Sequence, residues 1–488
     1  MKLFLSGHDY RYAVEQTVAT LFPGEKPEYP EEEAAAVLSV AMYSGKVFTS
    51  ACCALRTEEG LFRGRAAVRT ERFTNATEKD RLCQFIIKNA IYRAVRASGR
   101  PRPPWGALTG VRPGKLMHAM LKSGASPQQA VRRFMREYDV TEERALLCCE
   151  TSLATQKTEE SLQERDLCLY IGIPFCPTRC AYCSFVSQSV GKSLTLMEDF
   201  LDALLLEIRA NAEPVKRIGA RVVSFYAGGG TPTSLSAQQL DVLCGVLERE
   251  FDLSALREYT VEAGRPDTIT EEKLRILRAH GVDRVSVNPQ TMEDAVLEAI
   301  GRRHTAREVI EALDRVRKVG GMTVNMDLIA GLPADTEAGF ANSLEIVLAL
   351  QPENITVHTL SLKRGSGLAM GKGELPSPEA VRNMLEGAYP RLRKAGYTPY
   401  YLYRQKNMSG GFENTGWTTP GHENLYNICM MEELCSILAS GGGGSTKLIH
   451  PDGGKNIRLT APKYPLEYIR QIEKTCKDKE RIGEFYGV

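Results

Sequence analysis

The chain has 488 residues, of which 43% are hydrophobic and 25% are charged, so wholesale disorder, a collagen-like fibre and a disulfide-stapled miniprotein are excluded. The 62 Lys and Arg against 60 Asp and Glu leave a net charge of +2, which gives no general reason to expect a nucleic-acid or membrane partner. No apolar run approaches the ~18 residues that span a bilayer. The 13 cysteines, odd in number and often isolated, suit reduced thiols. We therefore expect a cytoplasmic protein.

Residues 1–160 predict a separate α/β module of unknown role, in which strand and turn signals precede helical segments such as 78–98. The middle of this module is basic, because the six charged residues from Arg93 to Lys115 are all positive. A solvated basic face is the ordinary interpretation of such a patch, and a site for RNA or another anion is the alternative.

From residue 167 to residue 395, short β-branched runs alternate with amphipathic helical patterns. The predicted strands are 168–173, 222–227, 259–262, 284–288, 323–329 and 354–359. This alternation predicts an α/β fold with a parallel sheet, closed partly into a (β/α)6 barrel like that of a TIM barrel. Residues 396–488 lose the alternation and predict a small C-terminal cap domain, with a tight turn at the glycines 441–444.

The strongest motif follows the first predicted strand, where Cys176, Cys180 and Cys183 have the spacing CxxxCxxC. Three thiolates so close can each bind one corner of a cubane cluster, which leaves one iron without a protein ligand. A zinc knuckle is the alternative, but structural zinc favours four ligands in paired halves, and no second half is visible in the sequence. Cys168, the nearest other cysteine, is expected to pack in the core of its strand.

The other strand ends carry polar groups or glycines. In a parallel barrel, catalytic groups gather at the carboxyl ends of the strands. The residues at the ends of the second to fifth predicted strands, or just beyond them, include Gly228, Gly229, Gly230, Thr231, Glu262, Asn288, Gln290 and Asp327, and Arg302 closes the helix that follows the fourth strand. Glycines let the backbone approach a ligand closely, while amides, guanidinium and carboxylates bind polar groups. His358, on the sixth strand, is interpreted as a core or rim histidine.

The cysteine motif, with an aromatic residue before its third cysteine, resembles the signature of the radical S-adenosylmethionine (SAM) enzymes. Three motifs narrow the resemblance: Tyr-x-x-Ile-Pro-Phe-Cys from Tyr170, Gly-Gly-Gly-Thr-Pro-Thr from Gly228, and Asp-Leu-Ile-x-Gly-Leu-Pro from Asp327. Residues 167–395 are thus similar to the oxygen-independent coproporphyrinogen III oxidases, and the whole chain is similar to the HemZ-type coproporphyrinogen dehydrogenases.

This resemblance implies a [4Fe–4S] cluster held by Cys176, Cys180 and Cys183, and one or two molecules of SAM. The residues that match contacts to the cluster-bound SAM are Tyr170, Gly229 and Glu262. The residues that match a second SAM site are Tyr182, Gly230, Thr231, Gln290, Arg302 and Asp327. In that superfamily an electron from the cluster cleaves SAM to a deoxyadenosyl radical. A protein reductant such as flavodoxin or ferredoxin is implied as well.

The implied reaction is the oxidative decarboxylation of coproporphyrinogen III to protoporphyrinogen IX in haem biosynthesis. A hydrogen atom leaves the β carbon of a propionate, and loss of carbon dioxide and one electron then leaves a vinyl group. The basic residues that we expect to hold the propionates are Arg284, Arg303, Lys363, Arg364 and Arg404.

Two positions depart from the decarboxylase pattern. Gly172 stands where that pattern has His, and Phe185 stands where it has a further Cys. An aromatic residue at the second place is also found in the related haem chaperones. Two alternatives therefore stay open: a haem-binding, chaperone-like protein that retains the cluster, and a radical SAM enzyme that acts on another porphyrin or on RNA.

Overall fold

The computed structural model describes residues 1–22, 24–110, 112–183, 188–189, 194–362, 366–368, 374–405, 409–450 and 454–488. Within these ranges the chain divides into two compact units, Met1–Cys149 and Glu150–Val488. Helix α5 (Glu142–Ser161) contains the division. Three residues singled out in the sequence, Phe185, Lys363 and Arg364, lie outside the described ranges.

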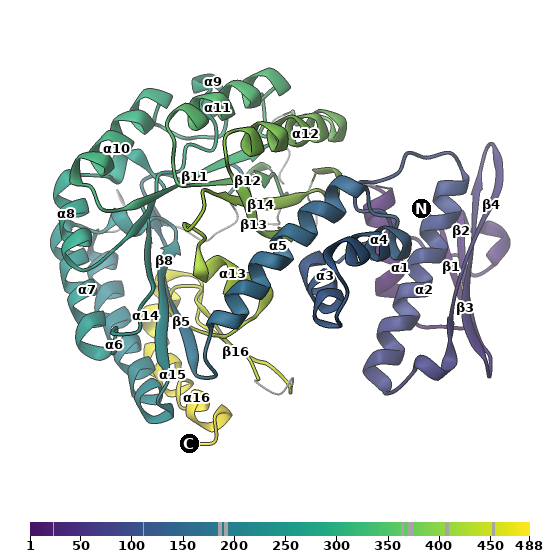
Figure 1. The fold of residues 1–488 in the computed structure, drawn as a ribbon, viewed down its shortest axis with the longest axis horizontal. Helices are drawn as coiled ribbons and strands as arrows, with labels where there is room; N and C mark the ends of the chain where they lie inside the picture. The colour runs from purple at the N-terminus through teal and green to yellow at the C-terminus, as the bar shows by residue number, and fades with distance from the viewer. Residues whose placement is uncertain are drawn as a thin grey trace. The chain divides into compact units, whose positions relative to one another are not determined.

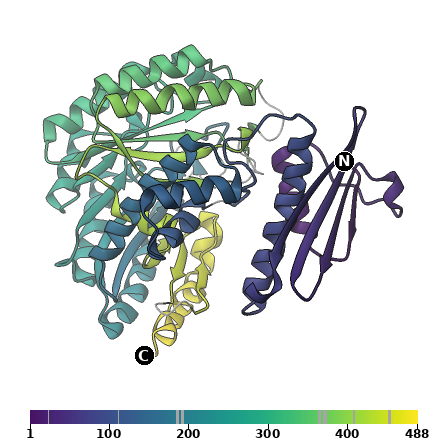
Figure 2. The ribbon, with the colours of Figure 1, turned by 45° about the vertical axis from the view of Figure 1, so that its right-hand side comes forward.

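The N-terminal unit is built on a four-stranded sheet with the strand order β1-β2-β3-β4. These strands are β1 (Leu3–Ser6), β2 (Leu38–Ser44), β3 (Phe48–Thr57) and β4 (Gly60–Arg69). β1 is parallel to β2, and the other two pairs are antiparallel. Figure 2 shows the helices α1 (Arg11–Leu21) and α2 (Ala76–Ala97) on one face of this sheet, where the apolar core of the unit lies.

The basic stretch of this unit is used largely by its own fold. Arg102 donates from Nε to the Asp139 carbonyl at 2.9 Å and from Nη2 to the Val140 carbonyl at 2.7 Å. Arg93 donates to the Arg65 carbonyl at 2.6 Å, and Arg96 donates to the Arg100 carbonyl. These arginine hydrogen bonds favour the interpretation of the patch as an ordinary basic face over a nucleic-acid site.

The helices that complete the unit are α3 (Pro113–Lys122), α4 (Pro127–Tyr138) and the first part of α5.

The second unit contains an open, 11-stranded sheet, and all six predicted strands are present at its centre. They are β5 (Asp166–Ile173), β8 (Arg221–Gly229), β9 (Glu258–Glu262), β10 (Arg284–Ser286), β11 (Thr323–Ala330) and β12 (Asn354–Thr359). Each is parallel to the next one along the chain. The sheet curves without closing, as predicted for a partial barrel (Figure 1).

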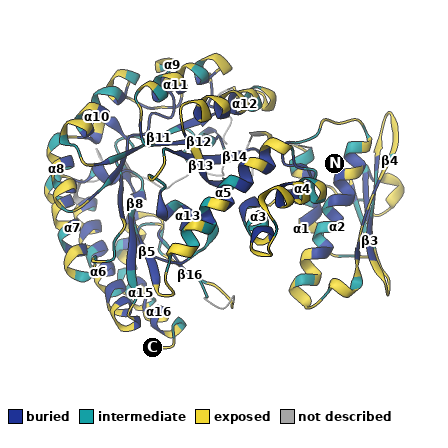
Figure 3. Ribbon diagram, in the orientation of Figure 1, coloured by how far each residue is buried: buried dark blue, intermediate teal, exposed yellow. Residues whose placement is uncertain are grey.

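Helices cover the outer face of the curved sheet (Figure 1). They are α6 (Leu194–Ile218), α7 (Ala237–Glu250), α8 (Glu271–Ala279), α9 (Asp294–Ala299), α10 (Ala306–Val319), α11 (Glu337–Ala349) and α12 (Pro378–Lys394). α10 is typical of the set: Thr305 and Glu308 form a capping box, and Val309, Leu313 and Val316 are buried. Figure 3 shows the exposed residues of these helices on the side away from the strands.

Residues after 396 add strands to both ends of the same sheet. β13 (Thr398–Arg404) and β14 (Glu413–Thr418) extend it beyond β12, while β15 (Ser436–Gly441), β16 (Ser445–Leu448) and β17 (Ile457–Thr460) extend it beyond β5. α13 (Leu425–Glu432) lies on the inner side of the curve (Figure 1). The last helices, α14 (Pro465–Arg470), α15 (Ile472–Lys477) and α16 (Glu480–Phe485), contact α6.

The predicted domain boundaries at 160 and 396, and with them the separate cap domain, stay predictions.

Among the described residues, none of the helices combines the length and the apolar character needed to cross a bilayer.

Candidate active site

The cysteine motif lies at the carboxyl end of β5, as predicted. The chain leaves β5 at Ile173, forms the two-residue strand β6 (Phe175–Cys176) and continues into a loop. Cys180 is buried, and Cys176 and Cys183 are half-buried. Their three sulfur atoms do not all lie within 4.8 Å of one another. This wider spacing suits a cubane, whose thiolates bind different irons, better than it suits a single metal ion.

Two neighbouring strand ends hold this loop. Arg265, just beyond β9, donates from Nη1 to Cys180 Sγ at 3.8 Å and to the Thr178 carbonyl at 3.4 Å, and its guanidinium pairs with Asp267. The Thr231 hydroxyl, beyond β8, lies 3.4 Å from Cys176 Sγ. Arg265 is almost fully buried, so its positive charge lies next to a sulfur atom that is expected to bind the cluster. Arg265 is not among the residues predicted from the sequence.

The glycine triplet brings the backbone of β8 against the start of the cysteine loop. Gly230 donates to the Ile173 carbonyl at 2.8 Å, and Thr231 donates to the Phe175 carbonyl at 2.7 Å. A Cβ atom at Gly230 would lie 2.5 Å from the Phe175 carbonyl oxygen, so a larger residue does not fit there. Gly229 has φ +105°, a conformation that favours glycine. Both glycines are therefore required by the close approach of the two strand ends.

Glu262, at the end of β9, belongs to a cluster of tyrosines on the inner side of the sheet. The Tyr226 hydroxyl donates to Glu262 Oε1 at 2.6 Å. The rings of Tyr226 and Tyr426 stack with centroids 4.5 Å apart, and Tyr170 stacks on both, at 6.3 Å from Tyr226 and 6.0 Å from Tyr426. Burial, and then the charge of Asp327, raise the pKa of Glu262 to about 7. This carboxyl thus changes its charge near neutral pH.

Arg302 links the cysteine loop to two strand ends. Its Nη2 atom donates to the Tyr182 hydroxyl at 3.1 Å, and its Nη1 atom donates to the carbonyls of Asn288 at 2.7 Å and Gly264 at 3.3 Å. Arg302 is buried, whereas Arg303 is exposed. Of the two adjacent arginines, Arg302 is therefore the one that faces the site.

Asp327 and Gln290 meet where β11 passes the segment beyond β10. Gln290 has φ +69° and donates its N–H to the Asp327 carbonyl at 2.9 Å. The Asp327 carboxylate accepts a hydrogen bond from Asn325 Nδ2 at 2.9 Å and pairs with His358 Nε2 at 3.5 Å. Burial opposes ionisation, but His358 and hydrogen bonds outweigh it and lower the pKa of Asp327. His358 was interpreted from the sequence as a core or rim residue, and its contact with Asp327 was missed.

Several buried polar atoms beside the cysteine loop have no hydrogen-bond partner among the described residues: Thr178 Oγ1, Asn288 Oδ1, Arg302 Nε and both ring nitrogens of His304. Burial, followed by the charges of Arg302 and Arg265, lowers the pKa of His304 to about 3, so its ring is neutral at pH 7. Buried polar groups normally find partners. Their gathering around the two arginines fits a polar ligand bound at this place, as SAM requires.

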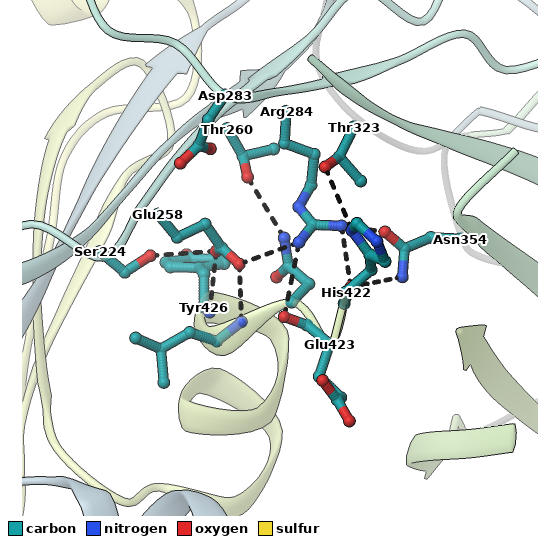
Figure 4. Close-up of polar contacts among 12 residues, drawn as sticks. Ser224, Glu258, Thr260, Asp283, Arg284, Thr323, Asn354, His422, Glu423 and Tyr426 are labelled. Atoms are coloured by element: carbon teal, nitrogen blue, oxygen red, sulfur yellow. Dashed lines mark hydrogen bonds and ion pairs between the residues drawn. The ribbon is translucent and has the colours of Figure 1, made fainter. Parts of the chain in front are cut away.

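The opposite, amino end of the barrel carries a different polar network, which Figure 4 shows. Arg284, the first residue of β10, donates to Asn354 Oδ1 and to the His422 carbonyl, and lies 3.5 Å from Glu258 Oε2. Glu258 also accepts from the Leu425 N–H at 2.8 Å and the Tyr426 N–H at 3.2 Å, at the start of α13. A cavity of about 540 Å³ opens at this end.

Two of the residues expected to hold propionates are used elsewhere. Arg284 lies at the end of the barrel opposite the cysteine loop, so its predicted contact with substrate is wrong. Arg404 donates from Nε and Nη2 to the Gly411 carbonyl, at 3.0 and 2.6 Å. Arg303 is exposed, and its contact with substrate stays a prediction.

Comparison with known proteins agrees with this architecture. Residues 170–347 match the radical SAM superfamily. The oxygen-independent coproporphyrinogen-III oxidase-like protein HemZ of Bacillus subtilis is 41% identical over 418 residues, which cover 84% of this chain and 83% of that protein. That match decides the family. The chain belongs to the HemZ-type coproporphyrinogen III oxidase-like proteins of the radical SAM superfamily.

Two further proteins are similar to this chain. The heme chaperone HemW of B. subtilis is 32% identical over 344 residues, 65% of this chain and 86% of that protein. The structure of the radical SAM coproporphyrinogen III oxidase HemN from Escherichia coli matches with a TM-score of 0.52 and 24% identity, over 67% of this chain and 73% of that one. The predicted family and fold are therefore confirmed, and the cofactors of this superfamily are a [4Fe–4S] cluster and SAM.

Proposed function

We propose that this chain catalyses the oxygen-independent oxidative decarboxylation of coproporphyrinogen III to protoporphyrinogen IX. The observation that carries the proposal is the convergence of Thr231, Arg265 and Arg302, which follow β8, β9 and β10, on the cysteine loop. We infer that these groups bind SAM, because their motifs resemble those of the oxidases. The similarity to a HemZ-type protein supports the class of substrate, and the contacts with the cysteine loop support the position of the site.

Cys176, Cys180 and Cys183 would hold the cluster, and Tyr170, Gly229 and Glu262 would contact the SAM bound to it. A second SAM would lie against Tyr182, Gly230, Thr231, Gln290, Arg302 and Asp327. When bound, the cluster and SAM supply the radical that removes a hydrogen atom from a propionate. Arg265 donates to Cys180 Sγ, and such hydrogen bonds to cluster sulfur atoms tune the reduction potential.

The two carboxyl groups of the site are set for different roles. The pKa of Glu262 is about 7, so near neutral pH Glu262 either donates or accepts a hydrogen bond. The lowered pKa of Asp327 keeps its carboxylate charged at neutral pH, and Asn325 and His358 fix its orientation. Asp327 is thus suited to accept hydrogen bonds from ribose hydroxyl groups, while the protonation of Glu262 responds to the charge of the cofactor.

The experiment is anaerobic turnover of the reconstituted protein with SAM and a strong reductant, with and without coproporphyrinogen III. Deoxyadenosine and the porphyrin product are both followed by chromatography. We expect deoxyadenosine release that depends on substrate, together with vinyl product. Background deoxyadenosine and no vinyl product would reject the decarboxylase.

A second candidate is a haem-binding protein that retains the cluster, and one observation favours it. Gly172 replaces the His of the decarboxylase pattern, and a Cβ atom there would lie 3.0 Å from the Gly442 carbonyl oxygen. Gly172 also pairs with Gly441 of β15, so the glycine-rich turn closes against this position. The 32% identity to a heme chaperone accords with this candidate. Stoichiometric haem binding, seen in the Soret band, without substrate-dependent deoxyadenosine would support it.

A further inference from the structure

Three cysteines outside the cysteine loop meet in the core of the second unit. Cys168 lies on β5, Cys429 on α13, and Cys435 immediately before β15. Their sulfur atoms all lie within 4.8 Å of one another, and those of Cys168 and Cys435 are 3.6 Å apart. Among the described residues, this is the one group of three metal-ligating side chains that is so close. We call it the buried thiol trio.

The trio is enclosed by apolar side chains. Cys168 and Cys429 have no exposed surface, and Cys435 is 8% exposed. Val223, Leu425 and Ile437 pack in the same cluster. Among the described residues, no histidine nitrogen or carboxylate oxygen lies within 4.8 Å of all three sulfur atoms, so a metal ion at the trio would have sulfur ligands.

This geometry matches a single metal ion. Three sulfur atoms that each lie about 2.3 Å from one ion, in a trigonal plane, are about 4 Å apart. Zinc in proteins is almost always four-coordinate, and an apolar shell discourages a water as fourth ligand. Soft thiolate ligands instead select Cu(I). We propose that Cys168, Cys429 and Cys435 form a three-coordinate site for one Cu(I) ion.

Binding of Cu(I) to the trio releases the thiol protons to solvent, because the thiolate is the form of cysteine that binds a metal ion.

The site would connect β5 to α13 and to the start of β15, and Cys435 lies 267 residues after Cys168 along the chain. Cys168 stands two residues before Tyr170, whose ring stacks on Tyr426 of α13 at 6.0 Å. The Tyr426 hydroxyl is buried without a partner among the described residues. A metal ion joining β5 to α13 and to the start of β15 would therefore fix α13 on the inner side of the sheet, directly behind the tyrosine cluster of the active site.

The test uses the full chain with Cys176→Ser, Cys180→Ser and Cys183→Ser, so that the cysteine loop cannot capture the probe. Cu(I) is titrated anaerobically in competition with bicinchoninate, and X-ray absorption at the copper edge counts the ligands. We expect one tightly bound equivalent with three sulfur neighbours. Adding Cys435→Ser should weaken binding by more than the ~100-fold that loss of an outer-shell partner costs.

The matched control is Cys244→Ser, which alters a buried thiol that accepts a hydrogen bond from Tyr259 at 3.3 Å and lies outside the trio. Binding should be unchanged in this control. An equal loss in both variants, or a tight equivalent that survives Cys435→Ser, would overturn the proposal. If Cys435→Ser does not fold, the X-ray absorption of the chain with an intact trio tests the proposal. A copper ion with fewer than three sulfur neighbours would reject the site.

Discussion

Arg302 Nη2 donates a hydrogen bond to the Tyr182 hydroxyl at 3.1 Å, and the same guanidinium binds the carbonyls that follow β9 and β10. Tyr182 lies between Cys180 and Cys183, so this contact connects the cluster-binding loop to the barrel. The Ala181 N–H adds a second connection, because it donates to the Ile300 carbonyl at 2.9 Å. The cysteine loop is therefore positioned by the segment 300–302 as well as by its own strand.

Arg302→Ala should destabilise the protein and impair cluster retention. The substitution leaves the buried carbonyl of Asn288 and the partly buried carbonyl of Gly264 without this donor, which costs about 3 kcal/mol in the free energy of unfolding. The measurement is urea unfolding of the apo-protein, together with cluster absorbance after reconstitution. Arg303→Ala is the control and should change the free energy of unfolding by less than about 0.5 kcal/mol, since Arg303 is exposed. Equal effects in both variants would contradict this assignment.

Gly230→Ala should displace the start of the cysteine loop. The added Cβ would lie 2.5 Å from the Phe175 carbonyl oxygen and 2.8 Å from that of Ile173, both of them backbone atoms. Overpacking of this kind costs about 1–3 kcal/mol, and we expect less cluster per chain after reconstitution. Gly245→Ala is the control, because nothing lies within 4 Å of its Cβ position on α7, and this change should stabilise the helix by about 1 kcal/mol.

The sequence predicted the six parallel strands and the place of the cysteine loop, because both signals are local. Alternating β-branched and amphipathic runs identify βα units, and the motif follows the first of them directly. The pairing of β15 with β5 and of β14 with β12 joins residues far apart along the chain. No local pattern specifies such partners, so residues 396–488 were not assigned to the sheet.

The site residues that were missed act through neighbours on other strands. His358 reaches Asp327 because β12 pairs with β11, and Arg265 reaches Cys180 although β8 lies between β9 and β5 in the sheet. The error on Arg284 had another origin. Arg284 is the first residue of its predicted strand and therefore lies at the amino end of that strand. Because the active site of a parallel barrel lies at the carboxyl ends of the strands, the strand direction alone excludes Arg284 from the site.

Glu262→Gln should change how stability depends on pH. The pKa of Glu262 is about 7 in the folded protein against an ordinary value of 4.5, so between these values the folded chain binds more protons than the unfolded chain. The free energy of unfolding of the wild type should therefore fall as pH rises from 4.5 to 7, relative to the variant. Urea unfolding of both apo-proteins at pH 5, 6 and 7 measures the difference. Parallel curves would show that this pKa is not raised.

Cys180→Ser should abolish assembly of the cluster, whereas Cys168→Ser should leave it intact. Cys180 is one of three thiolates in the motif and has a buried cation beside its sulfur, while Cys168 belongs to the separate thiol trio. Iron and sulfide content and the visible absorbance of the reconstituted proteins check both outcomes. Retained cluster absorbance in Cys180→Ser would reject the assignment of the ligands.

The C-terminal helices should depend on one buried ion pair. Lys479 Nζ lies 2.7 Å from Glu207 Oε1, and both side chains are at least 95% buried. Glu207 also accepts hydrogen bonds from the Gly441 N–H at 2.7 Å and from the Tyr468 hydroxyl. Lys479→Ala leaves this carboxylate buried without its cation, so the free energy of unfolding should fall by about 3–5 kcal/mol in urea unfolding. The double variant Glu207→Gln with Lys479→Met removes both charges and should lose less than Lys479→Ala alone. An equal or larger loss in the double variant would mean that packing, rather than charge, holds the C-terminal helices to α6.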